Sequence, residues 1–175
     1  MTEHLPDRLD LLAAAEAGRE LHGRVALASL ERVTPLLASP EGDLQVVMRL
    51  GKDPDGTYRL SGSIRGNVVL QCQRCLEEFT RALDVEFRLG LVRNQEAAAR
   101  LAQGYEPLLV TAEPASIADI VSDEILLALP FAPVHEDMNE CHGLYENYQP
   151  PAEAQRENPF AVLAGLKQKH PITGD

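Results

Sequence analysis

Cysteine and histidine are the residues of this 175-residue chain with the clearest chemical potential. Cys72 and Cys75 form a C-x-x-C pair, and the third cysteine, Cys141, lies near His135 and His142. A C-x-x-C spacing can place both sulfur atoms on one side of a tight turn, a geometry that suits a metal or a redox reaction better than ordinary packing. These residues therefore define two candidate chemistries, zinc binding and thiol–disulfide exchange.

A zinc site would combine the thiolates of Cys72, Cys75 and Cys141 with one imidazole, from His135 or from His142. Alternatively, the two neighbouring cysteines are a metal-free turn element. Only the C-x-x-C pair has diagnostic spacing, so the sequence favours the metal-free interpretation, with no cofactor and with zinc as the alternative. In that case Arg74 would be free to contact a partner or the acidic segment of its own chain.

Enzymatic uses of these residues have weaker support in the sequence. A thiol–disulfide oxidoreductase places its first cysteine at a helix N-terminus after a strand, whereas the sequence after Cys75 alternates as a strand. A hydrolase based on Cys141 would need a firmly held nucleophile, an orienting group and an oxyanion hole. The segment around Cys141 is polar and acidic, and no glycine-rich phosphate loop occurs in the chain. We therefore predict that the protein is not an enzyme.

Length and composition indicate one soluble domain spanning residues 1–175. Hydrophobic residues make up 45% and charged residues 25%, which is ordinary for globular proteins. No apolar run approaches the ~20 residues that span a bilayer, and the N-terminus lacks the features of a signal peptide. An odd number of cysteines argues against a disulfide framework and favours a reducing cytoplasm.

Charge is distributed unevenly along the chain, whose formal net charge is −11. Residues 112–157 hold ten acids and one base, whereas residues 59–100 hold seven arginines and five acids. An acidic protein is repelled by phosphate backbones, so the acidic part suits a basic protein partner. The candidate partner-binding residues are Arg74, Glu136, Asp137, Glu140 and Glu146.

Hydrophobic periodicity predicts a helix followed by consecutive strands. We expect a helix over residues 5–21, and strands over 24–37, 43–50, 58–70 and 83–91. Asp55-Gly56 marks a hairpin turn, and Gly62 and Gly66 within one strand suggest a bulge, a bend or a close approach of another element. Short connections favour an α+β fold with a curved antiparallel sheet, possible closure towards a barrel, and helices at both ends of the chain.

The second half of the sequence continues with shorter elements. We expect a short helix or loop over residues 95–104, a strand over 106–111 and a helix from a Ser116 cap to Pro130. Ile125, Leu127, Leu129 and Phe131 at the end of that helix are predicted to be core. We predict a mobile acidic loop over residues 135–157, a helix over 158–166 and a disordered tail over 170–175.

Four ordered motifs resemble the YceD family, the large ribosomal RNA subunit accumulation proteins. They are Val-Val-Leu-Gln-Cys-Gln-Arg-Cys-Leu over residues 68–76, Tyr-Glu-Pro-Leu over 105–108, the run over 123–135 and Asn-Pro-Phe-Ala-Val-Leu-Ala-Gly-Leu-Lys over 158–167. The resemblance implies a cytoplasmic bacterial factor, not an enzyme, needed for synthesis, processing or stability of large-subunit ribosomal RNA. Some relatives carry several more cysteines in the region where this chain keeps only Cys141.

Three mechanisms stay open at this point. In the first, the acidic half binds a basic ribosomal or RNA-processing protein, which electrostatic complementarity favours. In the second, the arginine-bearing sheet binds ribosomal RNA directly. The third is a thiol- or zinc-dependent enzyme. None of them involves a membrane.

Overall fold

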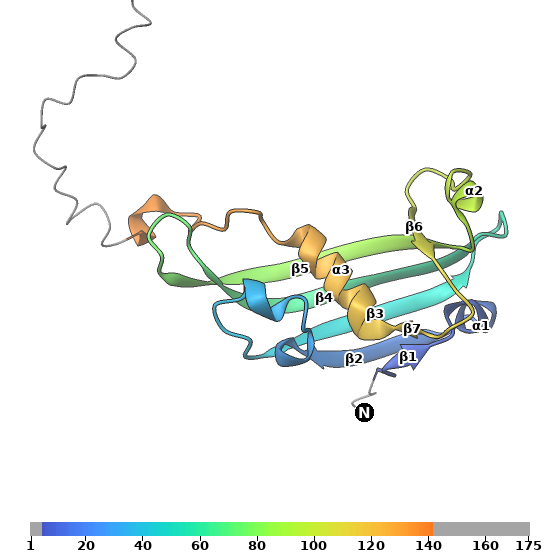
Figure 1. Cartoon of the computed structure of the whole chain (residues 1–175), viewed down its shortest axis with the longest axis horizontal. Helices are drawn as coiled ribbons and strands as arrows, with labels where there is room; N and C mark the ends of the chain where they lie inside the picture. The colour runs from blue at the N-terminus through green and yellow to red at the C-terminus, as the bar shows by residue number, and fades with distance from the viewer. Residues whose placement is uncertain (1–4, 142–175) are drawn as a thin grey trace, which may run out of the picture. The chain divides into compact units, whose positions relative to one another are not determined.

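A five-stranded sheet with the strand order β2-β3-β4-β5-β6 is the centre of the fold in the computed structural model, which describes residues 5–141 (Figure 1). Its strands are β2 (Glu20–Ala26), β3 (Asp43–Lys52), β4 (Tyr58–Gln71), β5 (Glu78–Val92) and β6 (Glu106–Leu109). β2 to β5 pair antiparallel with their neighbours in chain order. The predicted meander is therefore confirmed, with β4 and β5 as its longest strands.

Two hairpin turns connect the three central strands at opposite ends of the sheet. The β3–β4 turn is the one expected from Asp55-Gly56, and Gly56 adopts a φ of 85° there. Asp53 Oδ1 accepts hydrogen bonds from the backbone N–H groups of Asp55 and Thr57, which closes this turn. The β4–β5 hairpin ends in the turn that carries Cys72 and Cys75.

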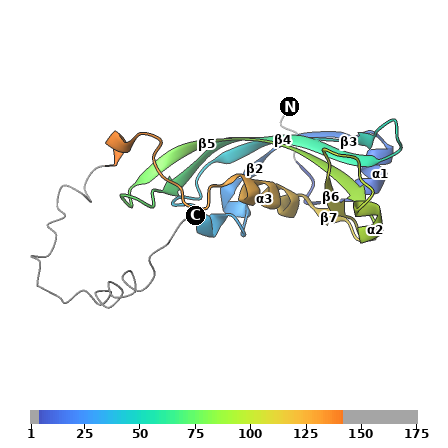
Figure 2. The same ribbon diagram turned by 90° about the horizontal axis from the view of Figure 1, so that it is seen from above.

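The sheet is mixed and open, which corrects the expectation of an antiparallel sheet closing towards a barrel. β6 lies parallel to β5, with Leu89 opposite Glu106, because the chain returns through α2 (Gln95–Ala98) before it pairs again. β2 and β6 form the two opposite edges and do not pair with each other. The sheet is nevertheless curved, as the arch in Figure 2 shows.

One face of the sheet is covered by helices and the other is left open (Figure 2). α1 (Leu11–Glu16) packs on β3 and β4, and α3 (Ile117–Ala128) packs on β5. The N-terminal helix is shorter than residues 5–21, because β1 (Arg8–Leu9) pairs with β7 (Ala115–Ser116) and β2 starts at Glu20. Residues 27–36, expected as part of a strand, form the 3₁₀ turns η1 (Leu27–Ser29) and η2 (Thr34–Leu36).

α3 begins as the sequence predicts, and its buried face has helical spacing. The Ser116 side chain caps the helix by accepting a hydrogen bond from the Asp119 N–H. Ile117, Ile120, Val121 and Ile125 are all buried in the single core beneath the sheet. These positions repeat every three to four residues, so a single stripe of the helix makes the contact.

Leu127 and Phe131 lie on the surface, which corrects the expectation that the whole helix end is core. Their exposed fractions are 73% and 106%, whereas Ile125 is fully buried. Leu127 follows Ile125 by two residues, about 200° around a helix of 3.6 residues per turn, so it points away from the core. Phe131 lies beyond the helix, which ends at Ala128.

Gly62 sits where the sheet leaves no room for a side chain. A Cβ atom built there would lie 2.3 Å from the Val47 carbonyl oxygen and 2.5 Å from Cζ of Phe87. Gly66 is similarly close to a Leu44 methyl group, at 2.6 Å. Of the three roles expected for these glycines, the structure confirms the close approach of neighbouring elements.

No helix within residues 5–141 is long and apolar enough to cross a membrane. The predicted 158–166 helix, the 170–175 tail and most of the 135–157 loop lie outside the described residues. The described beginning of that loop contains a 3₁₀ turn, η3 (Met138–Glu140), capped by the Asp137 side chain.

Candidate functional site

The turn between β4 and β5 holds Cys72 and Cys75 in place through backbone hydrogen bonds. The Cys72 N–H donates to the Glu77 carbonyl over 2.9 Å, and the Leu76 N–H donates to the Cys72 carbonyl over 2.8 Å. The Arg74 N–H points at the Cys72 sulfur, 3.4 Å away. The turn therefore brings both sulfurs inward, and both cysteines are buried.

Leu76, directly after the second cysteine, is the only non-glycine residue with positive φ in the described part of the chain. Its φ of 64° lies in the left-handed region, which costs a leucine roughly 1–2 kcal/mol relative to the right-handed one. The side chain is 56% exposed, so core packing does not offset this cost. A strained residue of this kind indicates that the surrounding structure fixes the geometry of the turn. Here that turn directs the two cysteines inward.

A second segment reaches this turn from the end of α3. Pro130 and Pro133 prevent the helix from continuing, and the chain runs to the end of the β4–β5 hairpin (Figure 1). There the Gln73 N–H donates to the Pro133 carbonyl over 2.8 Å, which fixes the segment to the turn. His135 follows two residues later and is buried.

Cys72, Cys75, His135 and Cys141 converge on one point. The Cys72 and Cys141 sulfurs lie 3.8 Å apart, and His135 Nδ1 lies 3.5 Å from the sulfurs of Cys75 and of Cys141. All four ligand atoms lie within 4.8 Å of one another. The structure thus brings together four of the five metal-ligating residues that the sequence singled out, and this group is called the cysteine–histidine cluster below.

The surroundings of the cluster shift the pKa values of two of its thiols in opposite directions. Burial acts to raise the pKa of Cys72, but the backbone N–H groups of Cys75, His135 and Arg74 outweigh it and lower this pKa to about 5. Burial, and then the neighbouring sulfurs of Cys75 and Cys72, raise the pKa of Cys141 to about 11. The lowered pKa of Cys72 favours its thiolate, the form of cysteine that binds a metal ion.

Two further side chains surround the cluster and were not assigned to it from the sequence. The Phe79 ring packs against the His135 imidazole, with ring centroids 4.8 Å apart. Arg74 Nη1 lies 3.7 Å from the Cys141 sulfur, so the guanidinium contacts its own chain. Phe79 lies on the inward-facing side of β5. The alternation of that strand is the sequence signal that could have placed Phe79 beside His135.

Three of the four predicted acidic residues lie next to the cluster in the chain. Glu136, Asp137 and Glu140 are exposed and stand between His135 and Cys141 in the chain. Glu146 and His142 lie outside the described residues. One acid expected at the surface is buried: burial, followed by the charges of Glu106 and Asp123, raises the pKa of Glu124.

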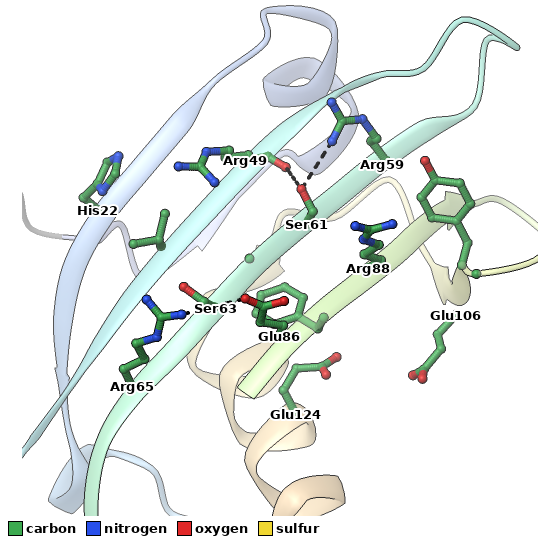
Figure 3. Close-up of a pocket in the computed structure, with 15 residues that line it drawn as sticks. His22, Arg49, Arg59, Ser61, Ser63, Arg65, Glu86, Arg88, Glu106 and Glu124 are labelled. Carbon is green, nitrogen blue, oxygen red and sulfur yellow. Dashed lines mark hydrogen bonds and ion pairs between the residues drawn. The ribbon is translucent and has the colours of Figure 1, made fainter. Parts of the chain in front are cut away.

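The open face of the sheet carries a polar groove of about 910 Å³ (Figure 3). Arginines from three strands line it, and carboxylates on neighbouring strands neutralise part of their charge. Arg49 pairs with Glu20 over 2.8 Å, and Arg65 pairs with Asp84 over 2.8 Å. The lining arginines are Arg49, Arg59, Arg65 and Arg88.

Comparison with known proteins identifies the family. The sequence model of the family described as large ribosomal RNA subunit accumulation protein YceD matches residues 60–167. A Haemophilus influenzae protein named Large ribosomal RNA subunit accumulation protein YceD is 32% identical over 170 residues, covering 94% of this chain and 97% of that protein. No solved structure matches significantly. The family match spans most of β4, all of β5, β6 and α3, and the cysteine–histidine cluster, and the chain belongs to the YceD family.

Proposed function

We propose that this protein supports the accumulation of large-subunit ribosomal RNA by binding a basic ribosomal or RNA-processing protein. The family and the name of the Haemophilus influenzae relative support the process. The partner class rests on one observation. Residues 112–141 expose six carboxylates and contain no lysine or arginine, and the same stretch exposes large apolar side chains.

The exposed acids belong to α3 and to the segments before and after it, and α3 and the segment after it run along one side of the sheet (Figure 1). Within residues 5–141, only Asp123 of this group forms an ion pair, with Arg32. The other carboxylates form no ion pair in that part of the chain, so a cationic partner would gain complementary charge and faster association. The exposed acids are Glu113, Asp119, Asp123, Glu136, Asp137 and Glu140.

Apolar anchors lie within the same stretch. Leu127, Phe131 and Met138 are 73%, 106% and 71% exposed. A groove of about 690 Å³ runs beside Phe131, between η2, the end of β4 and the end of α3. Exposed aromatic and aliphatic side chains beside a groove are typical of the buried centre of a protein interface. Charge would therefore attract a basic partner, and the apolar groove would hold it.

Direct RNA binding through the open face of the sheet has less support. Arg49 and Arg65 already pair with carboxylates of neighbouring strands, and Arg65 also lies 3.7 Å from Glu86. Among the described residues, only Arg59 and Arg88 of the groove lack such a pair. Affinity for RNA grows with the number of phosphates that basic residues neutralise, and two arginines supply a small share of it.

Affinity capture from ribonuclease-treated lysate tests the proposal. The test variant combines Glu136→Gln, Asp137→Asn and Glu140→Gln. A matched control combines Arg59→Gln and Arg88→Gln in the polar groove. We expect basic ribosomal or processing proteins to remain bound to the wild type and to the control after ribonuclease treatment, and to be lost from the test variant.

The opposite pattern would overturn the proposal. If the acidic variant recovers the same proteins as the wild type, and ribonuclease or the arginine substitutions abolish recovery, RNA is the direct ligand. Thermal unfolding of each variant separates a lost contact from a lost fold, because substitutions at these exposed positions are expected to change stability by less than about 0.5 kcal/mol.

A further inference from the structure

We propose that Cys72, Cys75, His135 and Cys141 bind one Zn²⁺ ion that fastens the acidic segment after α3 to the β4–β5 turn. The proposal concerns the architecture of the protein and does not depend on the identity of its partner. It rests on the distances, the donor set and the charge of the cysteine–histidine cluster.

The distances within the cluster fit the edges of a zinc tetrahedron. Zn–S bonds of about 2.3 Å and Zn–N bonds of about 2.0 Å place two sulfurs about 3.8 Å apart, and a sulfur and a nitrogen about 3.5 Å apart. The corresponding separations here are 3.8 Å for Cys72–Cys141 and 3.5 Å for both sulfur contacts of His135. The largest separation is 4.8 Å at most, so a metal would draw the cluster together slightly.

A disulfide does not account for the cluster as well as a metal does. The three cysteines are free, and a disulfide would require a sulfur–sulfur distance of about 2.05 Å. It would also use two sulfurs and leave one thiol and the His135 imidazole beside it without a role. Zinc uses all four ligand atoms, and three thiolates with one imidazole form an ordinary tetrahedral zinc donor set.

The charge balance also favours a divalent ion. Zn²⁺ with three thiolates and a neutral imidazole carries a net charge of −1, and binding releases the proton of each thiol that is still protonated. The Arg74 guanidinium, 3.7 Å from the Cys141 sulfur, supplies the matching positive charge. A buried ionic group needs such a partner, because an unpaired charge away from water is strongly disfavoured.

The number of ligands assigns the ion a structural role. Catalytic zinc sites keep a position open for water or substrate, whereas four protein ligands close the coordination sphere. The ion would link Cys72 and Cys75 to His135 and Cys141. The last two ligands stand on either side of the three exposed acids at positions 136, 137 and 140. Because such a site does not exist in the unfolded chain, its binding free energy becomes folding free energy.

Metal analysis of protein purified without added metal, and without a histidine tag, tests the proposal. We expect one zinc per chain in the wild type, and loss of zinc in Cys72→Ser, Cys141→Ser and His135→Ala. His22→Gln, a substitution of an exposed histidine on β2, serves as the matched control and should retain zinc. His135→Cys should also retain it, because a fourth thiolate replaces the imidazole.

Two measurements on the intact wild type do not depend on how the variants fold. A strong chelator should lower the melting temperature of the wild type, and added zinc should restore it. Replacement of zinc by cobalt(II) should produce the visible absorption bands of a tetrahedral cobalt–thiolate centre. The proposal is overturned if wild-type zinc does not exceed that of Cys72→Ser, or if the chelator leaves the melting temperature unchanged. Zinc kept by His135→Ala but lost from His142→Ala would overturn the ligand set.

Discussion

The sulfur atoms of Cys72 and Cys141 lie 3.8 Å apart, although 69 residues separate them in the chain. The first belongs to the β4–β5 turn and the second follows η3, so their contact joins one end of the sheet to the acidic segment. The Gln73–Pro133 backbone hydrogen bond and the packing of Phe79 on His135 support the same junction. The cluster is therefore a junction between two parts of the chain as well as a group of reactive side chains.

Paired substitutions in α3 distinguish its core face from its surface face. Ile125→Ala is expected to destabilise the protein by about 2–5 kcal/mol, because it removes a fully buried side chain. Leu127→Ala should change the free energy of unfolding by less than about 0.5 kcal/mol, because its side chain is exposed. Chemical denaturation measures both values. A large loss of stability in Leu127→Ala would contradict the assignment of Leu127 to the surface.

Glu124 predicts a dependence of stability on pH. Burial first, and then the charges of Glu106 and Asp123, raise its pKa in the folded protein above the ordinary value of 4.5. Between the ordinary pKa and the raised pKa, the folded state binds more protons than the unfolded state. The free energy of unfolding therefore falls as the pH rises through this range. Glu124→Gln removes the cost of the buried charge and should raise the melting temperature at neutral pH.

The same substitution should have little effect at about pH 3 and below, where the wild-type carboxyl is protonated in both states. Glu113→Gln is the control, because Glu113 is exposed and is not among the charges that act on Glu124, and it should bring no such gain. Thermal unfolding at both pH values measures the difference. An equal or lower melting temperature for Glu124→Gln at neutral pH would contradict the prediction, because it would show that the ionised Glu124 carboxylate does not destabilise the folded protein.

Gly62 is expected to tolerate no side chain. Its Cβ would meet the Val47 carbonyl at 2.3 Å, and a backbone atom in the middle of a sheet cannot move aside without breaking the pairing. Gly62→Ala should therefore cost more than about 3 kcal/mol, above the usual range for overpacking. Gly51→Ala is the control, because its nearest neighbour is Arg59 Nη2 at 3.9 Å. Similar melting temperatures for the two variants would rule out this close approach.

Local pattern was enough to predict the central strands from the sequence. In β3 and β4 the buried and exposed residues alternate as expected, and Asp55-Gly56 forms the predicted turn. The parallel pairing of β6 was not predicted, because it depends on the path of the chain through α2 and not on alternation. The barrel expectation failed for a related reason, since the period of a strand does not indicate whether the edges of its sheet meet.

The candidate site was likewise predictable where it depends on local sequence, and not where it depends on the path of the chain. The C-x-x-C spacing indicated two ligands, but only the fold shows that Cys141 and His135 reach the same turn. Leu127 and Phe131 resemble core residues in composition, and their exposure follows from helix phase and from where α3 ends. The burial of Glu124 likewise has no signal in a sequence where most neighbouring acids are exposed.

The ratio of large-subunit to small-subunit ribosomal RNA in cells that lack the gene is the most direct test of the proposed function. Deletion should lower this ratio, and the wild-type protein should restore it. The variant with Glu136→Gln, Asp137→Asn and Glu140→Gln should fail to restore it at equal protein level, whereas the Arg59→Gln, Arg88→Gln control should succeed. Full restoration by the acidic variant together with failure of the arginine control would contradict the account and place the active surface on the open face of the sheet.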